Sequence, residues 1–216
     1  MLFFRILLLP VSKHYTMKNI LLATGFLMLL TGCKKQPEIN AVEIIALPAS
    51  YTNYTILQGQ HYCDKSTPKL FAATKMSFKV KFDSSAIYQT VDPVNQYDIN
   101  KLFGFSEGDN HHLNSARLGW AWHTNALHLY GYVYSDSIRA MKEIARVNIG
   151  AEFICSVAVT AGGYVFTVND TSLVMPRLIK GVPLAGYWLY PYFGGDETAP
   201  HDILIRMKEE IKSPGH

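Results

Sequence analysis

The sequence predicts an all-β fold, an antiparallel β-sandwich with little helix, on three observations. Apolar and polar residues alternate along several short segments, turn-forming residues separate these segments, and patterns with a helical period are sparse. Alternation with a period of two is typical of a strand that buries one face and exposes the other. Residues 44–216 are long enough to bury one core, so we expect a single sandwich domain there.

The clearest predicted strand covers residues 75–82, KMSFKVKF, where the even-numbered residues are apolar and the odd-numbered ones are lysine or serine. Turns are predicted where glycine, asparagine and aspartate cluster, at residues 161–163 and 169–170. The other predicted strands share the same alternation and cover residues 153–160, 164–168 and 203–207.

Two segments depart from this pattern. Residues 136–145 are expected to form one short helix, and residues 207–211 either extend the last strand or fray. Residues 33–43 are polar, contain a proline and lack periodicity, so we interpret them as a tether in front of the domain.

Residues 117–134, RLGWAWHTNALHLYGYVY, predict a β-hairpin with its turn around Thr124 and Asn125. The second strand places an aliphatic set on one face and a polar-tipped aromatic set on the other. The aliphatic set is Leu127, Leu129, Gly131 and Val133, and the aromatic set is His128, Tyr130, Tyr132 and Tyr134.

The length of that turn decides which face the tryptophans join, because a shift of one residue exchanges the two faces of a strand. An even loop sets Trp122 opposite Leu127 and Trp120 opposite Leu129, and it brings Arg117 opposite Tyr132. An odd loop sets Trp120 opposite His128 instead. We favour the even loop because it pairs apolar residues with apolar residues.

Together with the strand and turn GYVFTVND at residues 163–170, the aromatic hairpin resembles the concanavalin A-like lectin/glucanase family, a jelly roll of two curved sheets. The resemblance covers about the last two-thirds of the chain. It implies that a carbohydrate is held on the concave sheet or by loops at its rim.

The ligand-binding residues expected from this reasoning lie on the hairpin and in the aromatic segment 186–202. A tyrosine ring stacks on the apolar face of a pyranose, and its hydroxyl reaches the sugar hydroxyls. The alternative is that these rings only pack, because aromatic residues prefer strands. The candidates are Arg117, His128, Tyr130, Tyr132, Tyr134, Asp196 and His201.

Asp196 and His201 have a second interpretation. They follow Gly194-Gly195 in a turn, and turns need local hydrogen bonds from short polar side chains. A rigid corner is slightly favoured there over a binding loop.

An enzyme of this fold class would use one of two mechanisms. A glycosidase needs two carboxylates at a set separation, and the Glu-x-Asp-x-Glu pattern of the glucanases is missing from the sequence. A polysaccharide lyase needs a histidine or tyrosine base and a cation for a uronate carboxylate, for which His128, Tyr130 and Arg117 are the candidates. We favour a glycan-binding protein without catalysis; a lyase and a protein-interaction or envelope-structural module are the alternatives.

No metal site and no cofactor are predicted. The loop SEGDNHHLNSAR, residues 106–117, contains His111 and His112, but adjacent histidines on an extended chain point in different directions. A solvated polar loop is the favoured interpretation. The sequence has no glycine-rich phosphate loop, nucleophile elbow or Cys-X-X-Cys pair.

The front of the chain predicts a lipid anchor. Residues 17–33 have a basic start, a short apolar run and the sequence Leu-Thr-Gly-Cys, which resembles the lipobox of bacterial lipoproteins. The resemblance implies a leader over residues 1–32 that is removed and a lipid on Cys33; an ordinary signal peptide with a chance cysteine is the alternative. Because a signal beginning at Met17 needs nothing upstream, we expect the true start at Met17, with a genuinely longer leader as the alternative. Lys34 replaces the acidic residue that commonly retains such proteins at the inner membrane, so we expect attachment to the outer membrane bilayer.

Charge and cysteine content set two further expectations. The net charge of +3 comes from Arg5, Lys13 and Lys18 in the leader, and without them 17 basic residues balance 17 acidic ones, so no nucleic-acid partner is expected. Cys63 and Cys155 either form a disulfide in an oxidising compartment or remain two buried thiols.

Overall fold

The computed structural model describes residues 50–181 and 183–210. These residues belong to one compact unit. The predicted leader, the lipidated Cys33 and the tether lie outside the described residues. Within the described ranges, no helix is long and apolar enough to cross a membrane.

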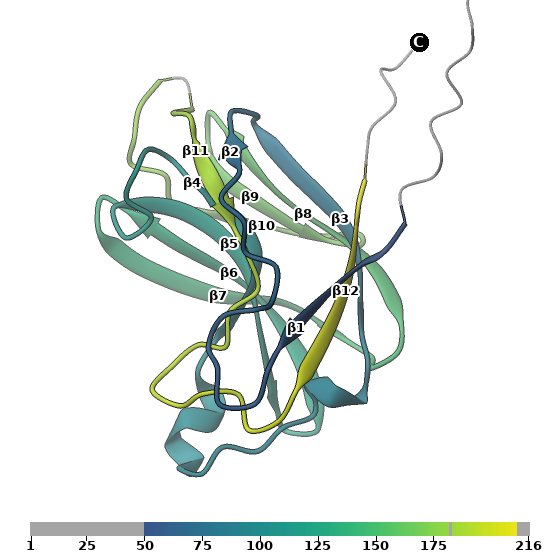
Figure 1. Ribbon diagram of the computed structural model, residues 1–216. Helices are drawn as coiled ribbons and strands as arrows, with labels where there is room; N and C mark the ends of the chain where they lie inside the picture. Colours follow the sequence, from purple (N-terminus) through teal and green to yellow (C-terminus); the bar gives the residue numbers. More distant parts are fainter. Residues whose placement is uncertain (1–49, 182, 211–216) are drawn as a thin grey trace, which may run out of the picture. The chain divides into compact units, whose positions relative to one another are not determined.

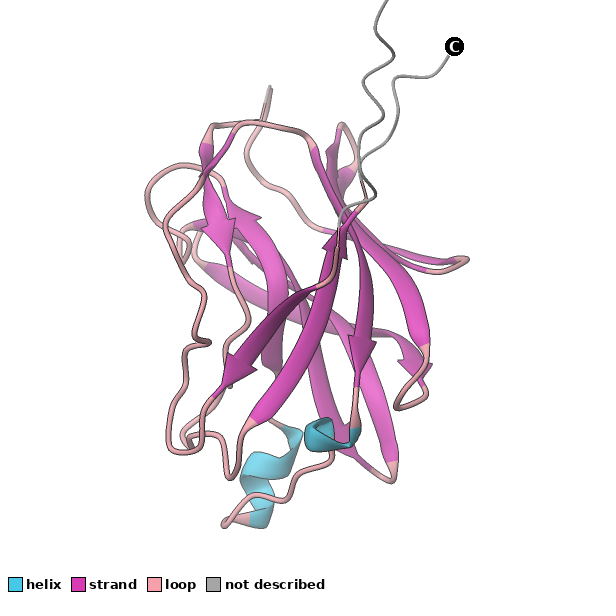
Figure 2. Cartoon of the chain, turned by 45° about the vertical axis from the view of Figure 1, so that its right-hand side comes forward, coloured by secondary structure: helices cyan, strands magenta, loops and turns pink. Residues whose placement is uncertain are grey.

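The described residues form two six-stranded antiparallel sheets that enclose the core, and the expected all-β antiparallel sandwich is confirmed (Figures 1 and 2). The first sheet has the order β1-β12-β3-β8-β9-β10, and the second has the order β2-β11-β4-β5-β6-β7. The strands of the first sheet are β1 Thr52–Ile56, β12 Ile203–Glu209, β3 Lys75–Phe82, β8 Glu152–Thr160, β9 Gly163–Val168 and β10 Thr171–Met175. Those of the second are β2 Leu70–Phe71, β11 Gly186–Leu189, β4 Asn100–Ser106, β5 Asn114–His123, β6 Ala126–Ser135 and β7 Ile138–Val147.

The strands predicted from alternation are present. β3 has the predicted bounds, and its residues alternate between buried and more exposed positions, with Met76, Phe78, Val80 and Phe82 in the core. β8 and β9 each begin one residue before the predicted start. β12 continues to Glu209, so the segment after residue 207 extends the strand.

The helix predicted at residues 136–145 is wrong, because this segment enters strand β7. Asp136 and Ser137 have φ values of 54° and 63° and form the two-residue turn between β6 and β7. Such a turn returns the chain antiparallel to the preceding strand, and β6 then supplies the hydrogen-bond partners of β7. The helices among the described residues are two short 3₁₀ helices at one end of the sandwich, η1 Ser84–Ala86 and η2 Pro93–Tyr97 (Figure 2).

The even register predicted for the β5–β6 hairpin is confirmed. Thr124 and Asn125 are the two turn residues, with φ values of 47° and 60°. The pairs are Trp122 with Leu127, Trp120 with Leu129 and Arg117 with Tyr132.

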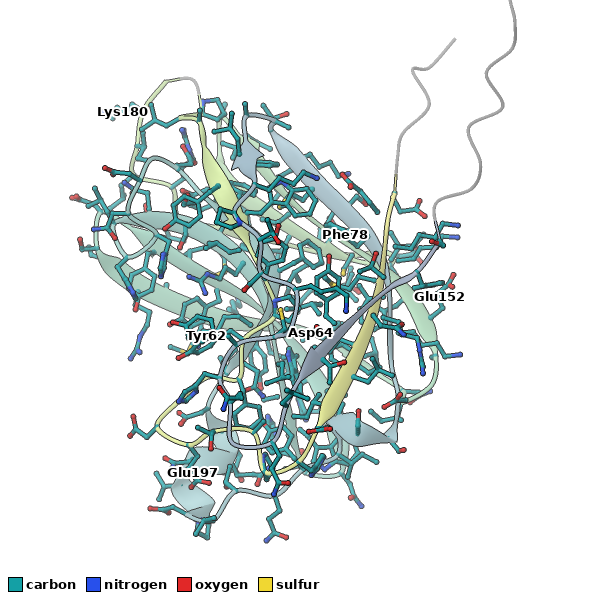
Figure 3. All side chains as sticks on the ribbon, in the orientation of Figure 1. Tyr62, Asp64, Phe78, Glu152, Lys180 and Glu197 are labelled. Carbon is teal, nitrogen blue, oxygen red and sulfur yellow. The ribbon has the colours of Figure 1, made fainter. Side chains whose placement is uncertain are left out.

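Aromatic side chains from both sheets fill the space between them. Phe78 of β3 lies between the sheets (Figure 3), with its ring centroid 4.4 Å from that of Phe103 of β4. Trp120 is fully buried, and its ring lies 5.2 Å from the ring of Phe82. Large aromatic groups contribute most of the area buried in such a core, so these contacts hold the two sheets together.

Cys63 and Cys155 are separate free thiols, which is the unpaired alternative considered above. Both side chains are buried, and burial raises the pKa of each thiol. Cys155 lies on β8 opposite Phe78 and packs as a small hydrophobic residue.

A buried ion pair ties the segment after β10 to the end of β4. Arg177 donates from Nη2 to Oε2 of Glu107 at 2.7 Å and from Nε to Oε1 at 2.8 Å. The two side chains are only 4% and 1% exposed. Arg177 also donates to the carbonyl oxygen of Ile179, and Leu184 donates its backbone N–H to Glu107 at 3.3 Å. The pair therefore shapes the loop that leads into β11.

We predict that Glu107→Gln lowers the free energy of unfolding by about 3 kcal/mol, because the buried guanidinium keeps its charge and loses its anion. Urea unfolding followed by tryptophan fluorescence measures this change. Asp109→Asn is the matched control, since Asp109 is exposed two residues away and should change stability by less than about 0.5 kcal/mol. Equal stability of the two variants would contradict the role given to the pair.

Candidate functional site

A cleft of about 420 Å³ lies on the face of the second sheet that points away from the core. We call it the aromatic cleft. Strands β4, β5, β6 and β11 contribute to it, together with the chain before β2, the loop before β5 and the chain after β11. Its lining residues are Tyr62, Ser66, Lys101, His111, His112, Arg117, Tyr132, Tyr134, Tyr187, Trp188, Leu189, Tyr190, Pro191, Tyr192 and Gly195.

The register of the β5–β6 hairpin places Arg117 and Tyr132 in the cleft. These two residues are opposite each other on adjacent strands, so their side chains lie on the same face. Leu118 and Val133, their neighbours in sequence, are buried on the core face. Tyr132 is 5% exposed, and burial raises its pKa to about 12, so its hydroxyl is protonated at neutral pH.

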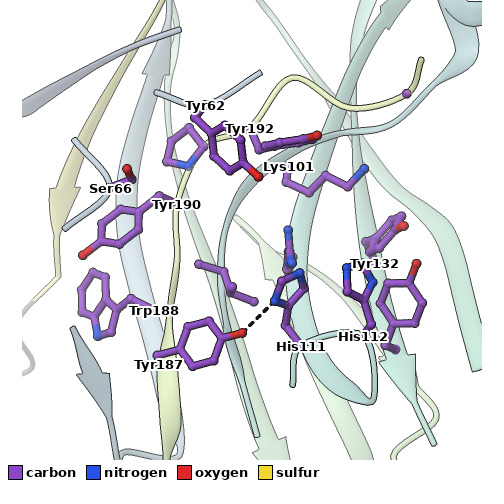
Figure 4. Close-up of a pocket in the computed structure, with 15 residues that line it drawn as sticks. Tyr62, Ser66, Lys101, His111, His112, Tyr132, Tyr187, Trp188, Tyr190 and Tyr192 are labelled. Carbon is purple, nitrogen blue, oxygen red and sulfur yellow. Dashed lines mark hydrogen bonds between the residues drawn. The ribbon is translucent and has the colours of Figure 1, made fainter. Parts of the chain in front are cut away.

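Lys101 lies between two tyrosine rings. Its Nζ is 4.7 Å from the ring centroid of Tyr132 and 5.9 Å from that of Tyr192 (Figure 4). Tyr192 is held beside it by a pair of backbone hydrogen bonds between the two residues, 2.8 and 3.0 Å long. Nζ donates to the carbonyl oxygen of Ile99 at 2.7 Å. A cation between aromatic faces is stabilised by their quadrupoles.

The glycine at position 194 is required for this arrangement. A Cβ at Gly194 would contact the carbonyl oxygen of Ile99 and would lie 2.6 Å from Nζ of Lys101. The backbone N–H of Gly194 donates to Oδ1 of Asn100 at 2.7 Å. The chain after β11 can therefore pack closely against β4 and bring Tyr192 to the cleft.

Arg117 is the most buried cation of the cleft. It is 9% exposed, and its Nε has no hydrogen-bond partner within the described structure. Burial lowers the pKa of Arg117, and nearby tyrosines, Tyr132 first, act in the opposite direction. A guanidinium remains protonated at neutral pH despite such a shift. The cleft therefore has a positive charge at its base.

His111 and Tyr187 form a polar pair at one wall. Nδ1 of His111 and the hydroxyl of Tyr187 are 2.7 Å apart (Figure 4). Burial, followed by the charges of Arg117 and His112, lowers the pKa of His111 to about 4. His111 is therefore neutral at pH 7 and can either accept from or donate to the tyrosine.

Exposed and half-buried rings form the rest of the walls. Tyr62 is 69% exposed, and its ring packs edge-on against Tyr192 at 5.0 Å. His112 packs edge-on against Tyr134 at 5.1 Å. Nζ of Lys69 lies 3.6 Å above the ring of Trp188. Such rings offer flat apolar surfaces with polar edges.

Of the predicted binding residues, Arg117, Tyr132 and Tyr134 line the aromatic cleft, and His128 and Tyr130 do not. His128 stacks on His123 with ring centroids 3.8 Å apart, and the hydroxyl of Tyr130 lies 2.8 Å from Nε2 of His123. The structure therefore does not bring His128, Tyr130 and Arg117 together in one cleft, as the lyase hypothesis required.

Asp196 and His201 also lie outside the residues that line the cleft. Asp196 is exposed, and Nε2 of His201 lies 2.8 Å from the carbonyl oxygen of Ser85. Glu197 accepts hydrogen bonds from the backbone N–H groups of Val91 and Asp92, at the start of η2. These contacts are those of a structural corner.

Sequence reasoning missed several lining residues. Lys101 lies on a strand that alternation did not reveal, because β4 contains a bulge between Lys101 and Phe103 and its residues are buried almost throughout. The sequence favours a solvated loop for His111 and His112, whereas both line the cleft. The aromatic run from residue 187 to residue 192 was the available signal for the other wall.

A metal site is not evident in the described ranges, where no group of three or more His, Cys, Asp or Glu side chains could hold an ion. The lining residues also include no aspartate or glutamate. The paired carboxylates of a glycosidase are therefore not among the residues that line this cleft.

No protein-family model and no curated protein matches the chain. Solved structures do: LamAcat from Zobellia galactanivorans matches with 11% identity over 72% of this chain and 74% of that one, at a TM-score of 0.46. The GH16 protein of the Bacteroides ovatus mixed linkage glucan PUL matches with 8% identity over 74% of this chain and 79% of that one, at a TM-score of 0.45. The alginate lyase AlyC3 matches with 10% identity over 76% of this chain and 72% of that one, at a TM-score of 0.48. All three matches have at most 11% identity and TM-scores below 0.5, so no function or residue role is taken from them.

We predict that Lys101→Met raises the free energy of unfolding at pH 7 by about 2 kcal/mol. Burial, followed by the charge of Arg117, lowers the pKa of Lys101 to about 8, whereas an unfolded chain keeps its lysines protonated to about pH 10.4. The unfolded state binds more protons between these values, so the stability of the unsubstituted protein rises between pH 8 and pH 10 relative to the variant.

Urea unfolding at four pH values from 7 to 10 measures this difference. Buried tyrosines titrate in both proteins, so their contribution cancels in the comparison. Lys142→Met, at an exposed position of β7, should leave the pH dependence unchanged. Parallel stability curves for the Lys101→Met variant and the unsubstituted protein would contradict the burial cost assigned to this lysine.

Proposed function

We propose that this protein binds a polysaccharide or other glycan in the aromatic cleft and does not cleave it. The observation that carries the proposal is the number of tyrosine rings around one cleft. Six tyrosines line it, and they come from three separate parts of the chain. They are Tyr62, Tyr132, Tyr134, Tyr187, Tyr190 and Tyr192.

The rings match the chemistry of a pyranose. One face of the sugar presents C–H groups that stack on an aromatic ring, and its hydroxyls pair with polar edges. Tyr62 and Tyr192 offer such a surface at the mouth, and the His111–Tyr187 pair offers polar atoms at the wall. A purely structural set of rings would be covered, yet Tyr62 is 69% exposed.

We predict that Tyr187→Ala and Tyr192→Ala each weaken glycan binding about 10-fold. Each substitution removes a ring that would stack on the sugar and the hydroxyl at the tip of that ring. Retention on a panel of neutral and acidic polysaccharides, followed by titration of the retained polymer, measures the effect. The same incubations are read for new unsaturated or reducing ends, which only a catalyst would produce.

Tyr97→Ala is the matched control. Tyr97 is 63% exposed on η2 and does not line the cleft, so its loss should leave retention within twofold. Retention that survives both cleft substitutions would place the binding surface elsewhere, and a complete lack of retention by the unsubstituted protein would favour a protein partner.

We further propose that the protein is a bacterial lipoprotein anchored to the outer membrane through Cys33. The support is the order of a basic start, an apolar run and Leu-Thr-Gly-Cys at residues 17–33. A lipid on Cys33 would hold the sandwich at a membrane surface through the tether of residues 33–43.

We predict that cells expressing the chain incorporate a radiolabelled palmitate into it and that Cys33→Ala abolishes the label. The physical reason is that the thiol is the nucleophile that takes the lipid. Cys63→Ala is the control, since Cys63 is buried in the sandwich and should not change labelling. A label retained by the Cys33→Ala variant would contradict the anchor.

A further inference from the structure

We propose that the glycan is acidic and that the aromatic cleft seats a carboxylate or sulfate of its sugar against Arg117 and Lys101. This inference rests on the proposed function, because it names the class of glycan that the same cleft takes. In this proposal, Arg117 and Lys101 form an anion subsite, and the aromatic rings of the cleft are the surfaces on which the sugar stacks.

The first argument is the state of Arg117. Its side chain is nine-tenths buried, it lines the cleft, and Nε has no partner within the described part of the chain. A buried guanidinium without an anion is costly, because desolvation is not offset by a hydrogen bond. An anion in the cleft would supply that hydrogen bond and the missing charge.

The second argument is a comparison within the same molecule. Arg177 is buried to a similar degree, and both oxygens of Glu107 accept from its guanidinium at 2.7 and 2.8 Å. The fold therefore supplies an internal carboxylate to one buried arginine. For Arg117 it supplies four tyrosines, and the acceptor has to come from outside.

The third argument is the position of Lys101. Its Nζ lies over the ring of Tyr132 (Figure 4). Tyr132 is directly opposite Arg117 on the neighbouring strand. Nζ has one hydrogen bond, to the carbonyl oxygen of Ile99. Two like charges therefore share one buried region, and an anion between them would relieve their repulsion.

The other charges near the cleft also favour the binding of an anion there. None of the lining residues is acidic, and the lining residues His111 and His112 are hydrogen-bond donors or acceptors rather than anions. Asp98 and Arg139 act on Lys101 from outside the lining set, with opposite effects on its charge. A carboxylate or sulfate would therefore meet donors and no repelling carboxylate within the cleft.

The test measures binding of the purified full-length chain, kept in a zwitterionic detergent without a sugar headgroup. The probes are alginate, polygalacturonate and a sulfated galactan. Each is paired with its neutral counterpart, in which the carboxylates are reduced to alcohols or the sulfates are removed. The measured quantity is the ratio of the two dissociation constants at the same ionic strength.

An acidic polymer that binds at least 10-fold more tightly than its neutral counterpart supports the inference, and the pair that shows the ratio identifies carboxylate or sulfate. Equal binding of both members of a pair overturns the inference and leaves the glycan-binding function intact. If no polymer of any pair binds, both the inference and the proposed function fail.

Substitutions locate the subsite. Arg117→Gln and Lys101→Gln should each reduce the acidic-to-neutral ratio at least fivefold. Lys142→Gln removes the same charge from β7 outside the cleft and should keep the ratio. Circular dichroism checks that each variant folds. If the Arg117→Gln variant does not fold, the acidic-to-neutral ratio of the Lys101→Gln variant tests the anion subsite. An unchanged ratio in a folded variant overturns the assignment of that residue.

Discussion

The two-residue turn at Thr124 and Asn125 is the constraint on which the candidate site depends. With both residues at positive φ, β5 and β6 pair in a register that puts Trp120 and Leu129 in the core. The same register forces Arg117 and Tyr132 onto the opposite face, because successive side chains of a strand alternate. One extra residue in this turn would exchange core and cleft on one of the two strands.

The other walls of the cleft depend on contacts between distant parts of the chain. Tyr192 pairs through its backbone with Lys101, and Phe193 donates its N–H to the carbonyl oxygen of His61. These hydrogen bonds join the segments before β2 and after β11 to the edge of β4. The tyrosines thus converge because backbone hydrogen bonds place their segments side by side, and their side chains add stacking contacts.

Arg117 and Arg177 illustrate how the same residue type takes two roles. The bidentate pair of Arg177 with Glu107 is internal and holds the loop that enters β11. Arg117 lies against tyrosine rings and faces the cleft, so its desolvation is only partly offset within the protein. If the proposed function holds, this site is organised before its ligand arrives, since the cost of burying the cation is met by folding.

The sequence by itself determined the all-β class, the strands with clear alternation and the even register of the β5–β6 hairpin, because a period of two and a short turn are local properties. It also pointed to Arg117, Tyr132 and Tyr134. Only the tertiary structure decided that residues 138–147 form an edge strand, that His128 and Tyr130 belong to a separate cluster, and that Lys101, His111 and Tyr187 share the cleft. Strand β7 follows β6 through a two-residue turn, but most of its residues are exposed and give no clear alternation. Lys101, His111 and Tyr187 meet because segments far apart in the chain lie side by side, and such pairing leaves no periodic signal in any one segment.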